Sequence, residues 1–169
     1  MLKHGSTVRV DVGMRSISHN FSSSGQRGAA AIEFALVFMI FFGIFYGVVT
    51  YSLPLLMMQS FNNATAEAVR QSVAISPTAS ASAAGYASLV TTQATSALSS
   101  QLSWIPSAFA FNVTSDAVVT FDGKLLTVGI NYPTSKLTQV LPVLTLPGIG
   151  NVPNLPTYLS AQASLQLAP

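Results

Sequence analysis

The sequence contains no cysteine, and its two histidines, His4 and His19, both lie near the start of the chain. Disulfide bonds and thiol chemistry are therefore excluded, and no imidazole follows residue 19 to act as a general base or metal ligand. The acids of the C-terminal part, Glu67, Asp116 and Asp122, are widely separated. We therefore expect a protein that is not an enzyme, with no catalytic residues, no metal site and no cofactor.

Charge is also scarce. Only 7% of the 169 residues are charged and 50% are hydrophobic, whereas soluble domains average about 25% charged residues. The basic residues form no cluster that a folded face could present to nucleic acid, so we expect no nucleic-acid partner. Gly148 and Gly150 lack the lysine and the context of a phosphate loop, and we expect no small-molecule substrate. A soluble monomer does not fit this composition.

A long apolar run is present instead. Residues 34–58 carry no charge, and this length exceeds the ~20 apolar residues that cross a bilayer. Lys3, Arg9, Arg15 and Arg27 precede the run, and Arg70 is the first basic residue after it. The positive-inside rule then predicts a single span in membrane lipid, with the N-terminus in the cytoplasm and the C-terminal part across the membrane.

One carboxylate lies at the edge of this run. Glu33 is the only charged residue between Arg27 and Glu67, and it follows Gly28 by five positions. An ionised side chain at the centre of a bilayer costs about 2.5–3.5 kcal/mol, so it usually has a partner or a function. We interpret Glu33 as functional, the alternative being that it lies at interface depth near Arg27.

Three further residues of the run bear on helix packing. Gly43 and Gly47 have the spacing of small residues that lets membrane helices approach closely. Pro54 removes one backbone hydrogen bond and clashes with the preceding turn, so we expect a kink or local unwinding at 51–54.

The segment around Gly28 has a recognisable pattern. Residues 27–34 read Arg-Gly-Ala-Ala-Ala-Ile-Glu-Phe. At the cytoplasmic edge of a single span and after a basic leader, this start resembles the type IV prepilins of tight-adherence (Flp) pili, and most closely the TadE-like minor pilins or pseudopilins. Major Flp pilins usually have tyrosine after the glutamate and are much shorter, so Phe34 and the large C-terminal part favour the TadE-like class.

The resemblance implies roles for particular residues. A prepilin peptidase is expected to cleave between Gly28 and Ala29, which makes Glu33 the fifth residue of the mature chain. In the family, glutamate at this position is thought to meet the terminal amine of a neighbouring subunit and to set axial register. Phe34 belongs to the same assembly segment.

The resemblance also implies partners and a location. The expected partners are the prepilin peptidase, related pseudopilins, the major Flp pilin, and an inner-membrane assembly platform with its secretion ATPase. The expected location is the bacterial inner membrane, with the C-terminus periplasmic, and incorporation into an extracellular pilus for surface attachment is left open. One alternative is an uncleaved single-pass protein that tethers a periplasmic interaction domain. Another is a secretory signal cleaved after Ala64-Thr65-Ala66.

Four segments are predicted. They are a cytoplasmic leader over 1–28, a transmembrane helix over 29–58, a periplasmic continuation of that helix over 59–76, and a small periplasmic α+β domain over 77–169. The helix as a whole is expected over about 29–75.

The predicted periplasmic domain combines one helix with a small antiparallel sheet. Small and apolar residues recur at helical spacing over 78–101, which predicts a second amphipathic helix. Strands are predicted at 117–121 and 125–132, joined by a two-residue turn at Asp122-Gly123. Strict alternation predicts a further strand over 158–167, with one face buried. A loop is predicted over 133–156, because proline and glycine are frequent there.

Overall fold

The structure is a computed structural model, and it describes Gly5, 24–146 and 150–167. Its elements confirm the predicted α+β class: a long N-terminal helix, further helices and a small antiparallel sheet. By their internal contacts the residues fall into two units, Met1–Phe41 and Phe42–Pro169, and each is treated by itself. Most of the predicted leader over 1–28 lies outside the described residues.

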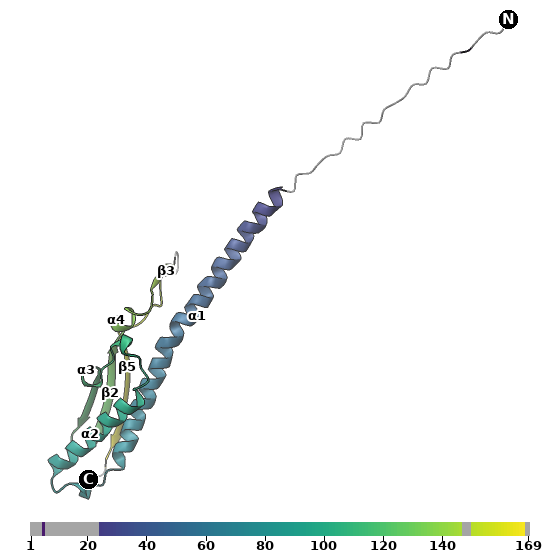
Figure 1. Ribbon diagram of the computed structural model, residues 1–169. Helices are drawn as coiled ribbons and strands as arrows, with labels where there is room; N and C mark the ends of the chain where they lie inside the picture. The colour runs from purple at the N-terminus through teal and green to yellow at the C-terminus, as the bar shows by residue number, and fades with distance from the viewer. Residues whose placement is uncertain (1–4, 6–23, 147–149, 168–169) are drawn as a thin grey trace. The chain divides into compact units, whose positions relative to one another are not determined.

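Helix α1 spans Ser24–Val73 (Figure 1). It is assigned as helix through Pro54, so the local unwinding predicted at 51–54 is not observed, and the predicted bend stays a prediction. Proline has no N–H to give to the carbonyl one turn before it. For Pro54 that carbonyl belongs to Thr50. The side-chain hydroxyl of Thr50 donates to the carbonyls of Tyr46 and Gly47, at 2.9 and 3.2 Å.

The second predicted helix is confirmed, with a later start. Helix α2 spans Ala83–Gln101 and follows a short 3-10 helix, η1, at Pro77–Ala79. The hydroxyl of Ser82 accepts a hydrogen bond from the N–H of Gly85 at 3.1 Å and caps α2, which accounts for the start after 78. The residues Val90, Ala94, Ala97 and Leu98 are buried, as the amphipathic pattern predicted.

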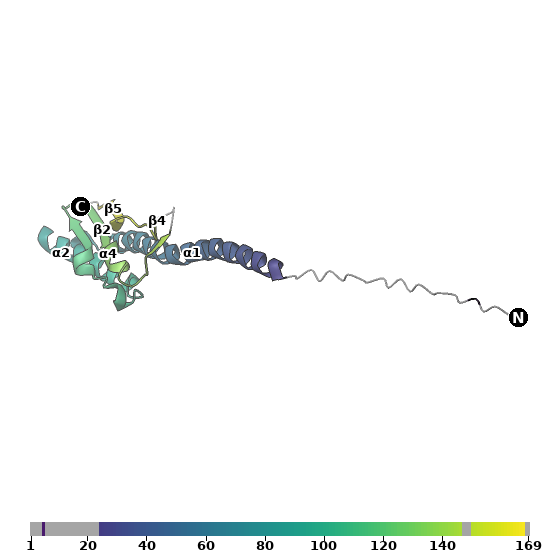
Figure 2. The same cartoon turned by 90° about the horizontal axis from the view of Figure 1, so that it is seen from above.

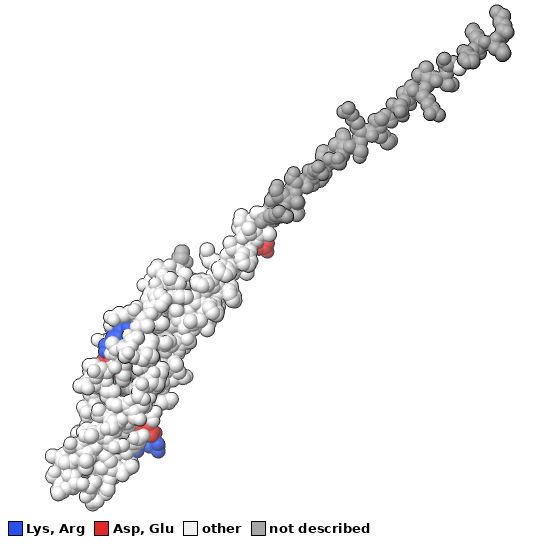
Figure 3. Space-filling view, viewed as in Figure 1, with Lys and Arg blue, Asp and Glu red and all other residues white. Residues whose placement is uncertain are grey.

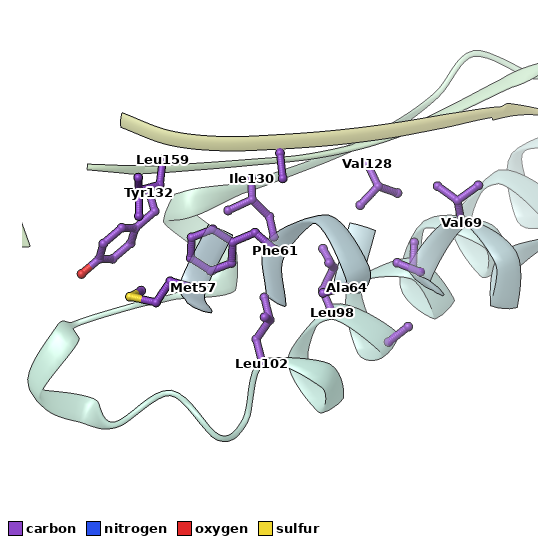
Figure 4. Close-up of a cluster of buried hydrophobic side chains, with 14 of the residues drawn as sticks. Met57, Phe61, Ala64, Val69, Leu98, Leu102, Val128, Ile130, Tyr132 and Leu159 are labelled. Carbon is purple, nitrogen blue, oxygen red and sulfur yellow. The ribbon is translucent and has the colours of Figure 1, made fainter. Parts of the chain in front are cut away.

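The main sheet has three antiparallel strands in the order β1, β2, β5. They are β1 at Ala117–Phe121, β2 at Leu125–Pro133 and β5 at Tyr158–Gln166. Alternate side chains of β2 are buried, and Leu159 and Ala161 of β5 are buried beside them. Helices α1 and α2 cover this inner face (Figure 4), whereas the outer face of β5 carries serine and glutamine. The alternation predicted for 158–167 is therefore confirmed at Leu159, Ala161 and Leu167, whereas Leu165 on the same face is 42% exposed.

Aromatic rings of α1 and the sheet meet in the core. Phe61 is fully buried, and its ring centroid lies 5.5 Å from that of Phe111 and 5.9 Å from that of Tyr132 (Figure 4). The hydroxyl of Tyr132 donates to the carbonyl of Phe109 at 2.7 Å. Burial, together with the nearby charge of Asp116, raises the pKa of Tyr132 to about 12, so this hydroxyl stays a donor at physiological pH.

An ion pair joins Asp116 and Lys136, which are 20 residues apart in the sequence. Lys136 Nζ lies 2.7 and 2.8 Å from the two carboxylate oxygens of Asp116, which is 4% exposed. Lys136 also donates to the carbonyl of Ala110 at 3.1 Å, and the N–H of Asn112 donates to Asp116 at 2.9 Å. These hydrogen bonds satisfy a carboxylate that burial alone would disfavour.

The turn between β1 and β2 differs from the prediction. The predicted central residues were Asp122 and Gly123, but Asp122 and Leu125 flank the turn, through a hydrogen bond from Asp122 N–H to the Leu125 carbonyl at 3.3 Å. The Asp122 carboxylate accepts from the N–H groups of Lys124 and Leu125, at 2.9 and 2.7 Å. This side-chain bonding moves the centre of the turn to Gly123 and Lys124.

We expect Gly123→Ala to destabilise the folded unit by about 1–2 kcal/mol, because Gly123 has a φ of +94°, where a β-carbon is strained. The measurement is urea unfolding of the full chain in detergent, followed by circular dichroism. Gly129→Ala is the matched control, because its added β-carbon meets no atom closer than 3.8 Å. Equal midpoints for the two variants would contradict the strain assigned to this turn.

The loop predicted over 133–156 is wrong in part, because short elements lie within it. Helix α4 at Thr134–Leu137 continues directly from β2, and β3 at Leu144–Leu146 pairs with β4 at Gly150–Val152 in a two-stranded antiparallel sheet. Two more short elements were not predicted, η2 at Ser107–Phe109 and α3 at Val113–Asp116. Elements this short carry no sequence period.

Within Phe42–Pro169, the β3–β4 sheet and the first turn of α2 lie at opposite ends. Both views show this arrangement (Figures 1 and 2). The main sheet and its covering helices occupy the space between them. The β3–β4 sheet is therefore separate from the core around Phe61.

Candidate functional site

The N-terminal part of α1 is an exposed apolar helix. Over Gly28–Val73 it is long and apolar enough to cross a membrane, and none of its most apolar stretch is buried inside the structure. The exposed large apolar side chains begin at Ile32 and include Phe34, which is 69% exposed and stacks on Phe38 with ring centroids 6.0 Å apart. An unburied apolar surface of this length requires a lipid or protein environment.

The predicted processing and register residues all lie in this helix. The Gly28–Ala29 peptide bond falls in the second turn of α1, near the end where helices fray. A β-carbon added at Gly28 meets no described atom within 4 Å. Ala29 and Glu33 are four residues apart, so they lie on one face of the helix, and the Glu33 side chain is exposed.

The two acids of α1 have different surroundings. Arg70 donates two hydrogen bonds to Glu67, at 2.7 and 2.6 Å, and Gln71 donates a third at 2.8 Å. The bonds from Arg70 and then from Gln71 lower the pKa of Glu67 to about 2. Glu67 therefore stays ionised at physiological pH with its partner on the same helix.

Glu33 lies in the unit Met1–Phe41. The described basic side chains are those of Arg70, Lys124 and Lys136, all within Phe42–Pro169, and Arg70 and Lys136 already pair with acids there. Figure 3 shows how few charged side chains the described surface displays on this face. A new amino group at Ala29, by contrast, would lie one helical turn from Glu33.

The predicted glycine contact face finds no counterpart among the described residues. A β-carbon built at Gly43 or Gly47 meets nothing within 4 Å. These glycines therefore leave space beside the helix that no described residue fills, and their role in helix packing stays a prediction.

Sequence reasoning missed two tyrosines that hold a distant segment. The hydroxyl of Tyr46 donates to the carbonyl of Pro142, and the N–H of Asn154 donates to the hydroxyl of Tyr51 at 2.7 Å. Pro142 lies just before β3 and Asn154 just after β4. Both legs of the β3–β4 hairpin are therefore attached to α1 within Phe42–Pro169. No local pattern predicts these contacts, because the partners are 96 and 103 residues apart.

Within the described parts of the chain, no group of three or more His, Cys, Asp or Glu side chains could hold a metal ion. A surface cavity of about 610 Å³ is lined by Asp116, Asn131 and Tyr158 among others. The carboxylate of Asp116 is already bonded to Lys136. The exposed apolar helix is thus the feature of the described residues that most needs a functional explanation.

One comparison with known proteins bears on this helix. Residues 28–70 match the family model described as TadE-like protein. The resemblance predicted from the sequence is confirmed over this segment, which runs from Gly28 through Glu33 to Arg70. No match was found among curated proteins or among solved structures. The TadE-like segment coincides with most of α1 and leaves the main sheet outside the match.

Proposed function

We propose that the chain is a minor pilin or pseudopilin that is processed by a prepilin peptidase and acts in assembly of a tight-adherence (Flp) pilus for surface attachment. The observation that carries this proposal is the TadE-like match, which begins at residue 28 and covers Glu33. The exposed apolar helix of the structure supports it, because a pilin subunit presents such a helix first to lipid and then to other subunits.

The energetics of helix transfer favour this function. Exposing a large apolar side chain to water costs about 1.5–3 kcal/mol, so α1 cannot be drawn into water as an isolated helix. Moving it from lipid into a bundle of similar helices keeps these side chains in an apolar medium. Polar pairing then decides how subunits dock.

Glu33 supplies that polar pairing in the proposal. Cleavage after Gly28 creates an ammonium group on Ala29, and the same group is present on each neighbouring subunit. Opposite charges about 4 Å apart attract by roughly 4 kcal/mol at an effective dielectric of 20. This attraction offsets the burial of the carboxylate and sets the axial position of one subunit against the next.

The remaining assignments follow from this role. The proposed partners are the prepilin peptidase, related pseudopilins, the major Flp pilin, and the inner-membrane platform with its secretion ATPase. The proposed location is the bacterial inner membrane with the C-terminus periplasmic. No enzymatic activity is proposed for the chain itself.

The experiment that tests the proposal is mass spectrometry of the full protein from the membrane fraction. A mature N-terminus at Ala29 supports processing. A chain that retains Met1 supports the alternative of an uncleaved single-pass tether and contradicts the proposal.

Gly28→Val is expected to block processing, leave the longer species in the membrane, and abolish pili. The peptidase must accommodate the residue before the scissile bond, and a branched side chain replaces a hydrogen atom there. The substitution does not disturb the described structure, because the β-carbon position is open. Ala30→Val is the matched control, since it adds the same side chain two residues later. Normal piliation in the Gly28 variant would contradict the pseudopilin role.

A further inference from the structure

Strands β3 and β4 and their flanks, residues 138–146 and 150–156, are attached to a part of α1 that was predicted to be inside the membrane. Tyr46 and Tyr51 bond the two legs of this hairpin, at Pro142 and Asn154. The predicted span ran to residue 58. Lipid cannot surround the helix where another segment of the chain covers it, so these contacts constrain how deep the helix can lie.

Burial along α1 gives a second constraint. Thr50 is buried, as are Met57 and Phe61 one and two turns beyond Pro54, and the compact unit that contains them begins at Phe42. One face of α1 therefore belongs to the folded domain well before residue 58. The opposite face of the same turns still exposes apolar side chains: Ile44, Phe45, Val48, Val49, Leu55 and Leu56.

The length of α1 is compatible with a membrane span that ends before residue 58. The residues from Gly28 to Tyr46 form a continuous part of α1, and at 1.5 Å per residue they extend about 27 Å. This is close to the ~30 Å hydrocarbon thickness of a bilayer. Tyrosine is enriched at the level of the lipid headgroups, where Tyr46 and Tyr51 would then lie.

The composition of the segment around β3 and β4 suits the level of the lipid headgroups. The sequence from Leu137 to the C-terminus contains no Asp, Glu, Lys or Arg. Val140 and Val143 before β3 and Leu144 at its start are exposed large apolar residues. The backbones of β3 and β4 pair with each other from Leu144 to Leu146, and the outer edges of this two-stranded sheet keep polar groups that the hydrated headgroup region can satisfy.

We infer that residues 138–146 and 150–156 form a membrane-surface contact at the boundary of headgroups and acyl chains, and that the outer end of the span lies near Tyr46–Tyr51. The occupant of this apolar surface is phospholipid, because the hairpin is attached to the helix where its exposed apolar surface continues toward the span. The inference rests on the proposed function, which places α1 in a membrane.

The test uses the absence of cysteine from the chain. Val143→Cys, Met39→Cys and Val118→Cys are made singly in the full chain, labelled with a nitroxide, and reconstituted in vesicles of phosphatidylethanolamine and phosphatidylglycerol. Collisions of each label with oxygen and with a water-soluble nickel chelate are then measured by spin resonance. Met39 is 75% exposed within the span, Val143 is 40% exposed, and Val118 is 54% exposed on the main sheet.

The expected result is a ratio of oxygen to nickel collisions at Val143→Cys that is several-fold higher than at Val118→Cys and that approaches the ratio at Met39→Cys. Val140→Cys, on the same segment, repeats the measurement in case one label perturbs the hairpin. A water-like ratio at residues 143 and 140 with a lipid-like ratio at residue 39 overturns the inference and leaves the proposed function standing. Low collision rates with both reagents at 143 and 140 indicate a protein neighbour, such as a second copy, and also overturn it. A water-like ratio at residue 39 overturns the membrane span itself.

Discussion

Glu33→Ala is expected to abolish adhesive fibres, while the processed protein still accumulates in the membrane. The carboxylate is the partner proposed for the ammonium group of a neighbouring Ala29, and losing an attraction of roughly 4 kcal/mol weakens docking by about a thousandfold. Insertion does not depend on this charge, because removing it makes the helix more apolar. The measurements are electron microscopy of the fibres and immunoblotting of the membrane fraction.

Two comparisons separate the charge from other effects of the substitution. Glu67→Ala changes the same residue type on the same helix, but Glu67 is paired with Arg70, so fibres are expected to persist. Glu33→Gln keeps the shape of the side chain and removes its charge, and it should fail as Glu33→Ala does. Fibres in normal number with either Glu33 variant would contradict the proposed register contact.

Phe61→Ala is expected to destabilise the folded unit by about 3–5 kcal/mol. The Phe61 ring is fully buried between α1 and the sheet, in contact with Phe111 and Tyr132, so its removal leaves a cavity that the surrounding rings cannot fill. A loss of this size is a large fraction of the about 5–15 kcal/mol by which native domains are stable. Urea unfolding of the full chain in detergent measures it.

Phe34→Ala is the matched control for this substitution. It makes the same truncation on the same helix, but Phe34 is 69% exposed and lies outside Phe42–Pro169. The unfolding midpoint of the domain is expected to be unchanged. If Phe61→Ala and Phe34→Ala gave equal midpoints, the packing of α1 on the sheet would be contradicted.

Periodic elements were predicted well because burial imposes a repeat on the sequence. The alternation over 158–167 reports the inner face of β5, and the recurrence of small and apolar residues over 78–101 reports the buried side of α2. The β1–β2 turn was misplaced by one residue, since the hydrogen bonds that the Asp122 carboxylate accepts from the backbone decide its centre. Short elements such as α3 and α4 have too few residues for any period.

The sequence by itself determined the apolar helix, the lone carboxylate at Glu33 and its distance from Gly28, because charge and hydropathy are properties of consecutive residues. Tertiary structure alone decided where the folded unit begins on α1, and that the segment around β3 and β4 attaches at Tyr46 and Tyr51. Those contacts join a side-chain hydroxyl to a backbone group 96 or 103 residues away. Every residue type except proline offers both backbone groups, so such a partner leaves no trace in the sequence.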